Sequence, residues 1–428
     1  MKVIWFLIYN IVGIPIQYFG FHLAGLFSKK IRQGISGRKR EHASLDRYQT
    51  MRDGASRCYM VHCASLGEYE MARPIIEKIQ EEKPEICIVL TFFSPSGYEQ
   101  VKESAPADVV TYLPFDSVPK LSDFFTRLRP EKLILTSYEV WPNLIWVSKR
   151  FGVEVYLTSA RLSDTSNKTL PLVRSLFRAV YSDIPHIYPI TDTDEQNLRR
   201  YFHLENTVDM MIFGNTRYDR VFGRSQEAQK THHLPQQFQH QPTVIAGSIW
   251  PADTKVIFPA FTSLLKEYPE LQIVCAPHEI SREHVDQIEE WCERNSIPYT
   301  LLSEYNSNDV RVLIVDEIGH LAEIYHDGDI AFVGGGFSGS VHNVMEPAVA
   351  HCAVFFGPEH QNSDEAVQLI EHAGGAAITS PDEVYQNLAH LLDHESDLQS
   401  MQAAAFHVIV ENTGATDKTV QRILQTEA

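Results

Sequence analysis

The chain has 428 residues, of which 44% are hydrophobic and 21% are charged. These proportions are ordinary for a globular protein, and the length allows two or three domains that each bury a core. The formal net charge of −18 argues against a nucleic-acid-binding protein, because such proteins normally carry a basic face. The 6 cysteines are scattered without a CxxC pair, which favours a reducing compartment and gives no zinc site.

The N-terminus begins with an apolar segment, residues 3–27, interrupted by Asn10, Pro15, Gln17 and His22. A helix of this length reaches about 37 Å, enough to cross a bilayer core of about 30 Å. The segment is too long for a cleaved signal peptide, and no small-x-small site follows it. The basic cluster at residues 29–40 then predicts that the following domain lies on the cytoplasmic side. The polar interruptions leave a second hypothesis open, in which the segment lies in the membrane interface or inserts as a hairpin.

Strands and helices alternate from residue 58 onward. In the first half, a helix is expected at residues 69–81 and strands at residues 58–64, 86–93, 132–136, 153–158 and 187–190. Residues 224–241 are polar and lack a hydrophobic period, which predicts an interdomain linker. The alternation restarts with strands expected at residues 243–246, 272–276, 312–315, 330–333 and 353–356. The pattern predicts an α/β protein with two doubly wound, Rossmann-like domains that face a cleft.

Three polar motifs stand where predicted strands of the first domain end. Residues 65–68 read SLGE, which fits the capping-box pattern, so a purely structural role is one interpretation. Residues 137–143 read SYEVWPN and carry an acid, an indole and a proline. Residues 159–163 read SARLS, in which Arg161 could pair with a phosphate or a carboxylate. Each motif alone favours a structural role, but three in succession along one sheet edge favour a site.

The second domain contains a stretch with the features of half a nucleotide-sugar site. Residues 331–361 begin as a buried strand that ends in Gly334, Gly335 and Gly336. Glycine lets a backbone approach a phosphate, and the helix start expected at residues 342–347 would offer free N–H groups to an anion. A carboxylate one turn into that helix could accept two hydrogen bonds from a ribose diol.

A structural interpretation of the same stretch stays open. Asn343 with Glu346 three residues later also fits a capping box, which many ordinary helices carry. The neighbouring FGPEHQN turn at residues 356–362 favours a ligand site, because ligands collect at the C-terminal ends of strands in open α/β sheets.

Taken in order, these motifs resemble those of the 3-deoxy-D-manno-octulosonic acid (Kdo) transferases of Gram-negative lipopolysaccharide synthesis. The family pattern is a membrane-proximal N-terminus followed by S-V-G-E, E-L-W-P-N, N-A-R-L-S, G-N-x-K-[FY]-D, G-G-H-N-x-x-E-P and F-G-P. The chain has SLGE at 65–68, EVWPN at 139–143, SARLS at 159–163, GNTRYD at 214–219, SVHNVMEP at 340–347 and FGP at 356–358. The match keeps the order over nearly the whole chain, which makes it more specific than any single motif.

The resemblance implies a GT-B glycosyltransferase that transfers Kdo from CMP-Kdo to a lipid A precursor of the lipid IVA type. The reaction would invert the anomeric carbon and use neither a metal nor a cofactor. The family's proposed general base falls on Glu68, because inversion requires a base that deprotonates the acceptor hydroxyl. Support on the acceptor side falls on Ser65, Gly67, Glu139, Trp141, Asn143 and Arg161. Donor binding falls on Ser248, His278, Gly334, Gly335, Gly336, Ser340, His342, Asn343, Glu346 and Asn362.

The chain departs from the family pattern at two places. The family's P-R-H signature appears here as Pro277-His278 without the arginine, and Arg282 could substitute for it. Val341 stands where a glycine usually precedes the histidine. These departures put the local donor contacts in doubt more than the family resemblance.

Two other hypotheses stay open. Another GT-B enzyme that uses a UDP-sugar, a glycosyltransferase or a sugar 2-epimerase, would share the paired sheets and the ribose-binding glutamate. Such an enzyme would not require SLGE with EVWPN or a basic membrane anchor. A membrane-attached scaffold with an inactive glycosyltransferase fold is disfavoured, because the carboxylates that the chemistry needs are present.

The expected organisation follows from these predictions. It is a membrane anchor at residues 1–28, an acceptor-binding domain at 29–222, a linker at 223–242 and a CMP-sugar-binding domain at 243–428, whose last helix could cross back. The expected partners are CMP-Kdo, the lipid A precursor and inner-membrane lipids, with no nucleic acid. The expected location is the cytoplasmic face of the inner membrane.

Overall fold

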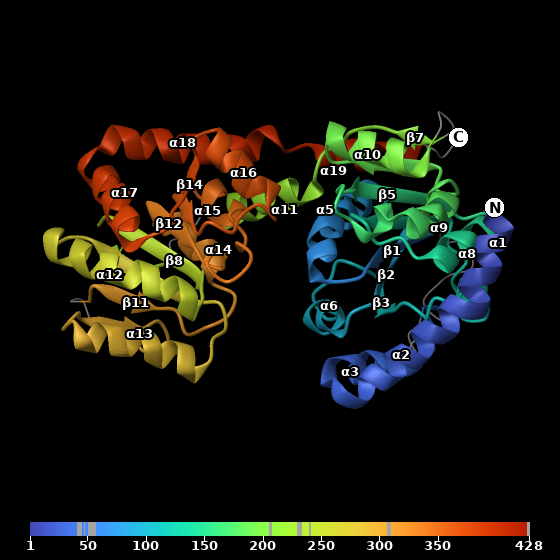
Figure 1. Cartoon of the computed structure of the whole chain (residues 1–428), viewed down its shortest axis with the longest axis horizontal. Helices are drawn as coiled ribbons and strands as arrows, with labels where there is room; N and C mark the ends of the chain where they lie inside the picture. The colour runs from blue at the N-terminus through green and yellow to red at the C-terminus, as the bar shows by residue number, and fades with distance from the viewer. Residues whose placement is uncertain are drawn as a thin grey trace. The chain divides into compact units, whose positions relative to one another are not determined.

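The computed structural model describes residues 1–40, 45–46, 48–49, 57–204, 208–228, 233–238, 241–305 and 310–425. The chain forms two compact α/β units (Figure 1). The N-terminal unit comprises Met1–Arg220 and Thr413–Ala428, and the C-terminal unit comprises Val221–Asn412. The last helix, α19 (Ala415–Gln425), belongs to the N-terminal unit and buries Val420 and Ile423 in its core.

A parallel sheet of 7 strands, ordered β3-β2-β1-β4-β5-β6-β7, forms the centre of the N-terminal unit. Its strands are β1 (Cys58–Cys63), β2 (Cys87–Phe92), β3 (Val109–Tyr112), β4 (Lys132–Thr136), β5 (Glu154–Ala160), β6 (His186–Pro189) and β7 (Asp209–Met210). The strand order reverses between the neighbours β1 and β4, which makes this pair the topological switch point where ligands bind in such folds.

Helices cover both faces of this sheet, because successive strand residues point to opposite sides. On β1, Met60 joins one hydrophobic cluster and Val61 joins the other, and Leu133 and Ile134 of β4 divide in the same way. The helices are α5 (Leu66–Glu82), α6 (Pro95–Val101), α7 (Val118–Leu128), α8 (Pro142–Arg150), α9 (Pro171–Tyr181) and α10 (Asp192–Phe202).

The C-terminal unit repeats this plan with a second parallel sheet of 7 strands, ordered β10-β11-β9-β8-β12-β13-β14. Its strands are β8 (Thr243–Ile249), β9 (Gln272–Pro277), β10 (Tyr299–Leu301), β11 (Val312–Ile314), β12 (Ile330–Val333), β13 (Ala353–Phe356) and β14 (Gly375–Ala377). Its helices are α12 (Pro251–Glu267), α13 (Arg282–Arg294), α14 (Leu321–Ile324), α15 (Met345–Val349), α16 (Asp364–Glu371), α17 (Pro381–Asp393) and α18 (Glu395–Glu411). The two sheets confirm the predicted fold class.

The predicted linker at residues 223–242 overlaps a helix. Helix α11 (Thr216–Ala228) continues through its first residues, and residues 229–232 and 239–240 lie outside the described residues. The buried side chains of this part of α11 include Ser225 and Ala228. Small and polar contact residues give no hydrophobic period, which explains why the sequence pattern predicted an irregular segment there.

The N-terminal segment is helical and lies against its own unit. It consists of α1 (Lys2–Ile8), the π-helical turn η1 (Tyr9–Gly13), α2 (Ile14–Phe27) and α3 (Lys29–Gly37). Pro15 lies in the first turn of α2, where its missing N–H is tolerated, and the π turn ends two residues before it. Lys2–Phe27 is long and apolar enough to cross a membrane, and only 6% of its most apolar window is buried.

Polar contacts tie this segment to the N-terminal unit. The Tyr9 hydroxyl donates to Asp116 Oδ2 at 2.7 Å, and the side-chain amides of Asn10 and Asn143 exchange two hydrogen bonds of 2.9 Å. The Trp5 indole donates to Ser175 Oγ at 3.0 Å. Figure 1 shows α1 beside α8 and α9, which carry Asn143 and Ser175. The polar residues that interrupt the apolar sequence are therefore among those that seat the helix on the protein.

Candidate functional site

Glu68 lies in the first turn of α5, directly after β1 and at the switch point of the sheet. Its side chain is 6% exposed. The Ser65 N–H donates to Glu68 Oε2 at 2.7 Å, and the Ser65 hydroxyl donates to the same oxygen, so the expected capping box is formed. Within the described part of the chain, Oε1 makes no hydrogen bond. The turn therefore fixes one carboxylate oxygen and leaves the other available.

Glu139 follows β4, the strand beside β1, and lies close enough to Glu68 for the two charges to interact. Burial raises the pKa of Glu139 first, and the negative charge of Glu68 raises it further, while the Lys168 ammonium opposes both effects. The same two carboxylates also raise the pKa of the Tyr138 hydroxyl, after burial. Two acidic side chains thus interact at the ends of the neighbouring strands β1 and β4.

Lys168 is a cation of this site that the sequence did not indicate. It lies on the short helical turn Asn167–Thr169, donates to the Tyr138 carbonyl, and places its ammonium 4.8 Å from the Phe177 ring centre. Burial lowers its pKa to about 8, although Glu139 opposes this shift. The sequence around a single lysine in a polar loop does not mark it as part of a site, because the aromatic side chains that surround it in the structure belong to α9.

Gly67 is exposed, and no crowding requires a glycine there. A Cβ atom at this position would touch only Ser65 Oγ, at 3.8 Å. Arg161 follows β5 at the same edge of the sheet and is half-buried. The open space above Gly67 is compatible with a bound substrate beside Glu68.

Trp141 and Asn143 have structural contacts in this unit. The Trp141 ring stacks on Phe93 at 4.7 Å. Asn143 is buried, donates to the Asp116 carbonyl at 2.7 Å, and bonds Asn10 of the N-terminal segment. Asp116 is a further residue that the sequence did not indicate, and it accepts the N–H groups of Asn143 and Leu144 at the start of α8. Asn143 therefore anchors the N-terminal segment.

In the C-terminal unit, three aromatic side chains stack where β8, β9 and β12 end. The His278 and His342 rings lie 4.0 Å apart at an angle of 8°, and the Trp250 ring lies 4.7 Å from His278. The Trp250 indole N–H donates to His342 Nε2 at 2.8 Å. Burial, followed by the charge of His278, lowers the pKa of His342 to about 4. His342 is therefore neutral near pH 7, and because Nε2 is an acceptor, its proton lies on Nδ1.

Asp253 holds the loops around this stack. It is fully buried and accepts the N–H groups of Trp250 at 2.8 Å and Gly335 at 2.9 Å. Neither Trp250 nor Asp253 was among the predicted site residues. A signal was present, because a proline directly after residue 250 and an acid three residues after it are typical of a helix N-terminus.

The three glycines after β12 are required by the surrounding backbone. A Cβ atom at Gly334 would lie 2.3 Å from the Ser248 carbonyl oxygen, and one at Gly336 would lie 2.7 Å from the Gly357 backbone. Gly335 has a φ of 95°, in the left-handed region. Close packing of the loops after β8, β12 and β13 is thus sufficient to explain these glycines, and no bound phosphate is needed to account for them.

The helix start expected in residues 342–347 lies at Met345. Helix α15 begins at Met345 with Val344 as its N-cap, and Asn343 Oδ1 accepts the Met345 N–H at 3.2 Å. Val344, and not Asn343, is therefore the N-cap residue, in contrast to the structural interpretation that stayed open for this stretch. The reason is that the His342 N–H donates to the Gly334 carbonyl, which holds this part of the loop against the end of β12. Glu346 lies in the first turn of α15 and is half-buried.

The remaining predicted donor residues differ in their positions. Ser248 lies at the end of β8 in a left-handed conformation, while Ser340 and Asn362 are exposed on the loops after β12 and β13. Arg282 forms ion pairs with Asp286 at 2.6 Å and Glu289 at 3.0 Å. The substitution of Arg282 for the missing family arginine is therefore not supported, because its guanidinium is held on its own helix.

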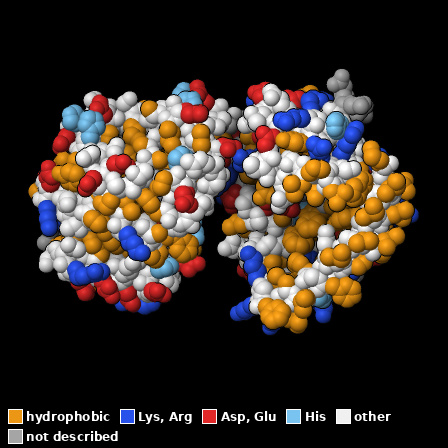
Figure 2. Space-filling view, in the orientation of Figure 1, with side chains coloured by type: hydrophobic (Ala, Val, Ile, Leu, Met, Phe, Trp, Pro, Cys, Tyr) orange, Lys and Arg blue, Asp and Glu red, His pale blue; other side chains and the backbone are white. Residues whose placement is uncertain are grey.

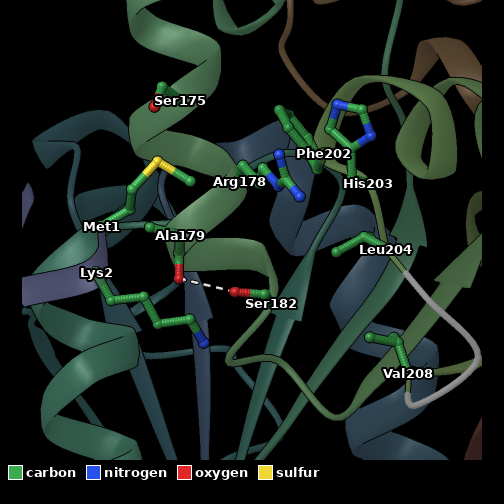
Figure 3. A pocket seen from close by; sticks show the side chains of 10 residues that line it. All are labelled: Met1, Lys2, Ser175, Arg178, Ala179, Ser182, Phe202, His203, Leu204 and Val208. Atoms are coloured by element: carbon green, nitrogen blue, oxygen red, sulfur yellow. Dashed lines mark hydrogen bonds between the residues drawn. The ribbon is translucent and has the colours of Figure 1, made fainter.

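A separate pocket of about 360 Å³ lies at the start of α1, away from these strand ends (Figure 3). Met1 and Lys2 form one side of it, and Arg178 of α9 and Phe202 of α10 lie opposite. Lys2 also pairs with Asp183 at 2.7 Å. The pocket shows that even the first residues of the chain are seated on the N-terminal unit.

Comparison with known proteins identifies similar proteins. Residues 38–220 match the family model of 3-deoxy-D-manno-octulosonic-acid transferase (kdotransferase). The chain is 27% identical over 372 residues to the 3-deoxy-D-manno-octulosonic acid transferase of Haemophilus influenzae, covering 85% of each protein. It is 25% identical to the enzyme of the same name from Chlamydophila psittaci, covering 84% of this chain and 82% of that protein.

Solved structures support the fold. The UDP-GlcNAc 2-epimerase of Neisseria meningitidis superposes with a TM-score of 0.63 at 14% identity, covering 86% of this chain and 100% of that one. The fold is therefore GT-B, as predicted. The sequence relatives confirm the resemblance to the Kdo transferases, and the chain is a glycosyltransferase.

Proposed function

We propose that the chain transfers Kdo from CMP-Kdo to a lipid A precursor of the lipid IVA type, with Glu68 as the general base. The observation that carries this proposal is the position of Glu68 on a rigid turn at the switch point, with Oε2 fixed by Ser65 and Oε1 free. A fixed carboxylate beside the uncrowded Gly67 is suited to accept a proton from a positioned hydroxyl.

In this mechanism, Glu68 Oε1 accepts the proton of the acceptor hydroxyl. The hydroxyl oxygen attacks the anomeric carbon of Kdo from the face opposite the cytidylate. The bond between that carbon and the phosphate oxygen breaks, and cytidine monophosphate leaves with the bonding electrons. Inversion at the anomeric carbon follows from attack on the opposite face.

On the donor side, His342 is suited to stabilise the leaving phosphate. Its Nε2 is engaged by Trp250, so the proton on Nδ1 is available as a donor. A neutral donor that is held in place before the reaction stabilises charge as it develops, with little reorganisation. His278, stacked on His342, offers an aromatic face beside it.

The N-terminal segment is proposed to attach the enzyme to the membrane in the plane of the interface, without crossing the bilayer. Its inner face bonds Asp116, Asn143 and Ser175, and those contacts would have to break if the helix spanned. Its outer face is apolar, as Figure 2 shows along this edge of the N-terminal unit. Highly exposed side chains on it are Val3, Ile4, Ile11, Ile16, Phe19, Leu23, Leu26 and Phe27.

This attachment is testable with Ile16→Glu/Phe19→Glu, because these side chains are 66% and 72% exposed. The double variant should lose most of its binding to vesicles that contain anionic lipid and should keep its melting temperature. Ile318→Glu, at a side chain that is 88% exposed in the C-terminal unit, is the control and should bind as the wild type does. Unchanged vesicle binding of the double variant would contradict the proposal.

A donor and acceptor screen tests the function itself. Incubation with CMP-Kdo and lipid IVA should give a product whose mass is increased by Kdo, together with cytidine monophosphate. The rival hypothesis, a GT-B enzyme that uses a UDP-sugar, predicts turnover with UDP-sugars and none with CMP-Kdo. The absence of product with CMP-Kdo, together with turnover of a UDP-sugar, would overturn the proposal.

A further inference from the structure

A second cavity, of about 530 Å³, lies between the N-terminal helices and the body of the N-terminal unit. Its size is within the range of about 300–1,000 Å³ that is typical of small-molecule sites. Tyr18, Phe21, Ile35 and Phe115 line it with apolar surface, and Arg38, Lys39, Lys120, His22 and Asp123 also border it. We call this cavity the N-terminal pocket.

Packing holds the walls of the N-terminal pocket in place. Arg38 donates to the carbonyls of Phe93 at 2.8 Å and Leu113 at 3.1 Å, the residues that directly follow β2 and β3. The Phe115 ring meets the Tyr18 ring edge-on at 5.5 Å. Gly37 packs so closely on Tyr112 that a Cβ atom would lie 2.4 Å from its ring. The walls of the N-terminal pocket are therefore held in place by contacts within this unit.

The charges around the N-terminal pocket favour an anion. Three cations and one carboxylate border it, and the first forty residues of the chain contain no acidic residue. The side chains of Lys39 and Lys120 are exposed, and in the described part of the chain neither is recorded in an ion pair. Two such ammonium groups beside an apolar cavity match a phosphate that is attached to an acyl chain.

The position of the N-terminal pocket connects the membrane with the candidate active site. Helix α2 contributes one wall, and its other face is the apolar surface assigned to the membrane. From the same pocket, the Arg38 guanidinium lies 4.4 Å from the Phe93 ring, and that ring stacks on Trp141. Trp141 is two residues from Glu139, so a lipid in the pocket would place its sugar head near the paired carboxylates.

We infer that the N-terminal pocket binds the lipid part of the acceptor, with an acyl chain between α2 and Phe115 and a phosphate between Lys39 and Lys120. This inference rests on the proposed function, because it takes the acceptor to be a phosphorylated, acylated sugar. It assigns acceptor selection to the N-terminal helices, which therefore recognise the substrate as well as attaching the enzyme to the membrane.

The test uses Lys39→Glu/Lys120→Glu in the full-length chain, with Lys266→Glu/Lys418→Glu as a control that has the same change in net charge and exposed positions. With detergent-dispersed lipid IVA, the pocket variant should raise KM by at least about tenfold, because two cationic contacts to the phosphate are replaced by carboxylates that repel it. The control should keep its KM within about twofold. With an acceptor that lacks its phosphates, pocket variant and wild type should differ little.

A second variant tests the apolar part. Pro119→Trp, at an exposed residue of the pocket lining, should obstruct the cavity without disturbing the core. It should raise KM for lipid IVA and leave KM for a deacylated, phosphorylated acceptor sugar unchanged.

For the lysine variants, an equal KM increase in the pocket variant and the control would show that only general surface charge matters, and would overturn the inference.

Direct binding separates this inference from the proposed function. Native mass spectrometry of the wild type should show one retained lipid IVA molecule that phosphatidylglycerol displaces poorly, and the pocket variant should lose this lipid. If the wild type retains lipid IVA but never transfers Kdo, the pocket stands and the proposed reaction fails. If phosphatidylglycerol is retained equally well, the pocket holds bulk lipid and the inference fails.

Discussion

Replacing Glu68 by glutamine separates the two roles that this residue could have. Glutamine at the third position of a helix can still accept the Ser65 N–H, so the capping box should survive and the free energy of unfolding should fall by less than about 1 kcal/mol. As a general base, in contrast, an amide is ineffective. The turnover number should fall by about 10²–10⁴-fold, which corresponds to roughly 3–5 kcal/mol in the activation barrier.

The assay compares cytidine monophosphate release with stability measured by urea unfolding. Glu68→Ala should lose activity to the same extent and also lose about 1 kcal/mol of stability, because the Ser65 N–H loses its partner. Glu81→Gln provides the matched control, since it makes the same charge change at the far end of α5, at a side chain that is 73% exposed. Turnover of Glu68→Gln equal to that of the wild type would refute the assignment and leave Glu68 with a capping role alone.

Two further predictions concern the contacts that position the sites. Trp250→Phe keeps an aromatic ring beside His278 but removes the hydrogen-bond donor to His342 Nε2. The value of kcat/KM should therefore fall about tenfold, and the imidazole ¹⁵N shifts of His342 should report a mixture of tautomers. An unchanged spectrum would contradict the assigned proton position. Burial, the largest cause, raises the pKa of Asp116 from its ordinary 3.8 to about 6. The folded protein therefore holds this proton between pH 4 and pH 6 while the unfolded chain releases it, so the free energy of unfolding should fall by up to about 3 kcal/mol as the pH rises through this window. Asp116→Asn should flatten this dependence in urea titrations, and an unchanged slope would show that the pH dependence has another origin.

The buried strands could be predicted from the sequence, whereas the edge strands could not. The bounds of β4, β12 and β13 match the predicted ranges, because each is a continuous apolar run in the middle of a parallel sheet. The short strands β3, β7, β10 and β14 were not predicted. They are the four outermost strands of the two sheets, where burial on both faces is incomplete and composition gives little signal.

The candidate sites show a similar division. Motifs at strand ends predicted that the SLGE and EVWPN segments would lie along one edge of the sheet, because parallel strands end at one edge, whereas only the structure shows that Glu68 and Glu139 interact. Lys168 and Asp116 act through partners distant in sequence, so no local pattern marks them. The N-terminal segment shows the converse. Its apolar length indicated a membrane, but only the tertiary contacts of Tyr9 and Asn10 show which face of the helix is seated on the protein.

The proposed donor site also indicates how the chain would compensate for the arginine that the family pattern places before His278. Burial lowers the pKa of His278, and that of His342 falls to about 4, so both rings are neutral near pH 7. The leaving phosphate would then be stabilised by the neutral N–H group of His342, in place of the positive charge of an arginine. Interactions between exposed ions weaken with salt, whereas a hydrogen bond from a neutral, partly buried donor is screened much less. The affinity for cytidine monophosphate should therefore change less than about threefold between 50 mM and 500 mM salt in calorimetric titrations, and restoring an arginine by inserting it between Pro277 and His278 should make that affinity salt-dependent. A wild-type affinity that falls tenfold or more over this range would show that a cation elsewhere in the chain binds the phosphate.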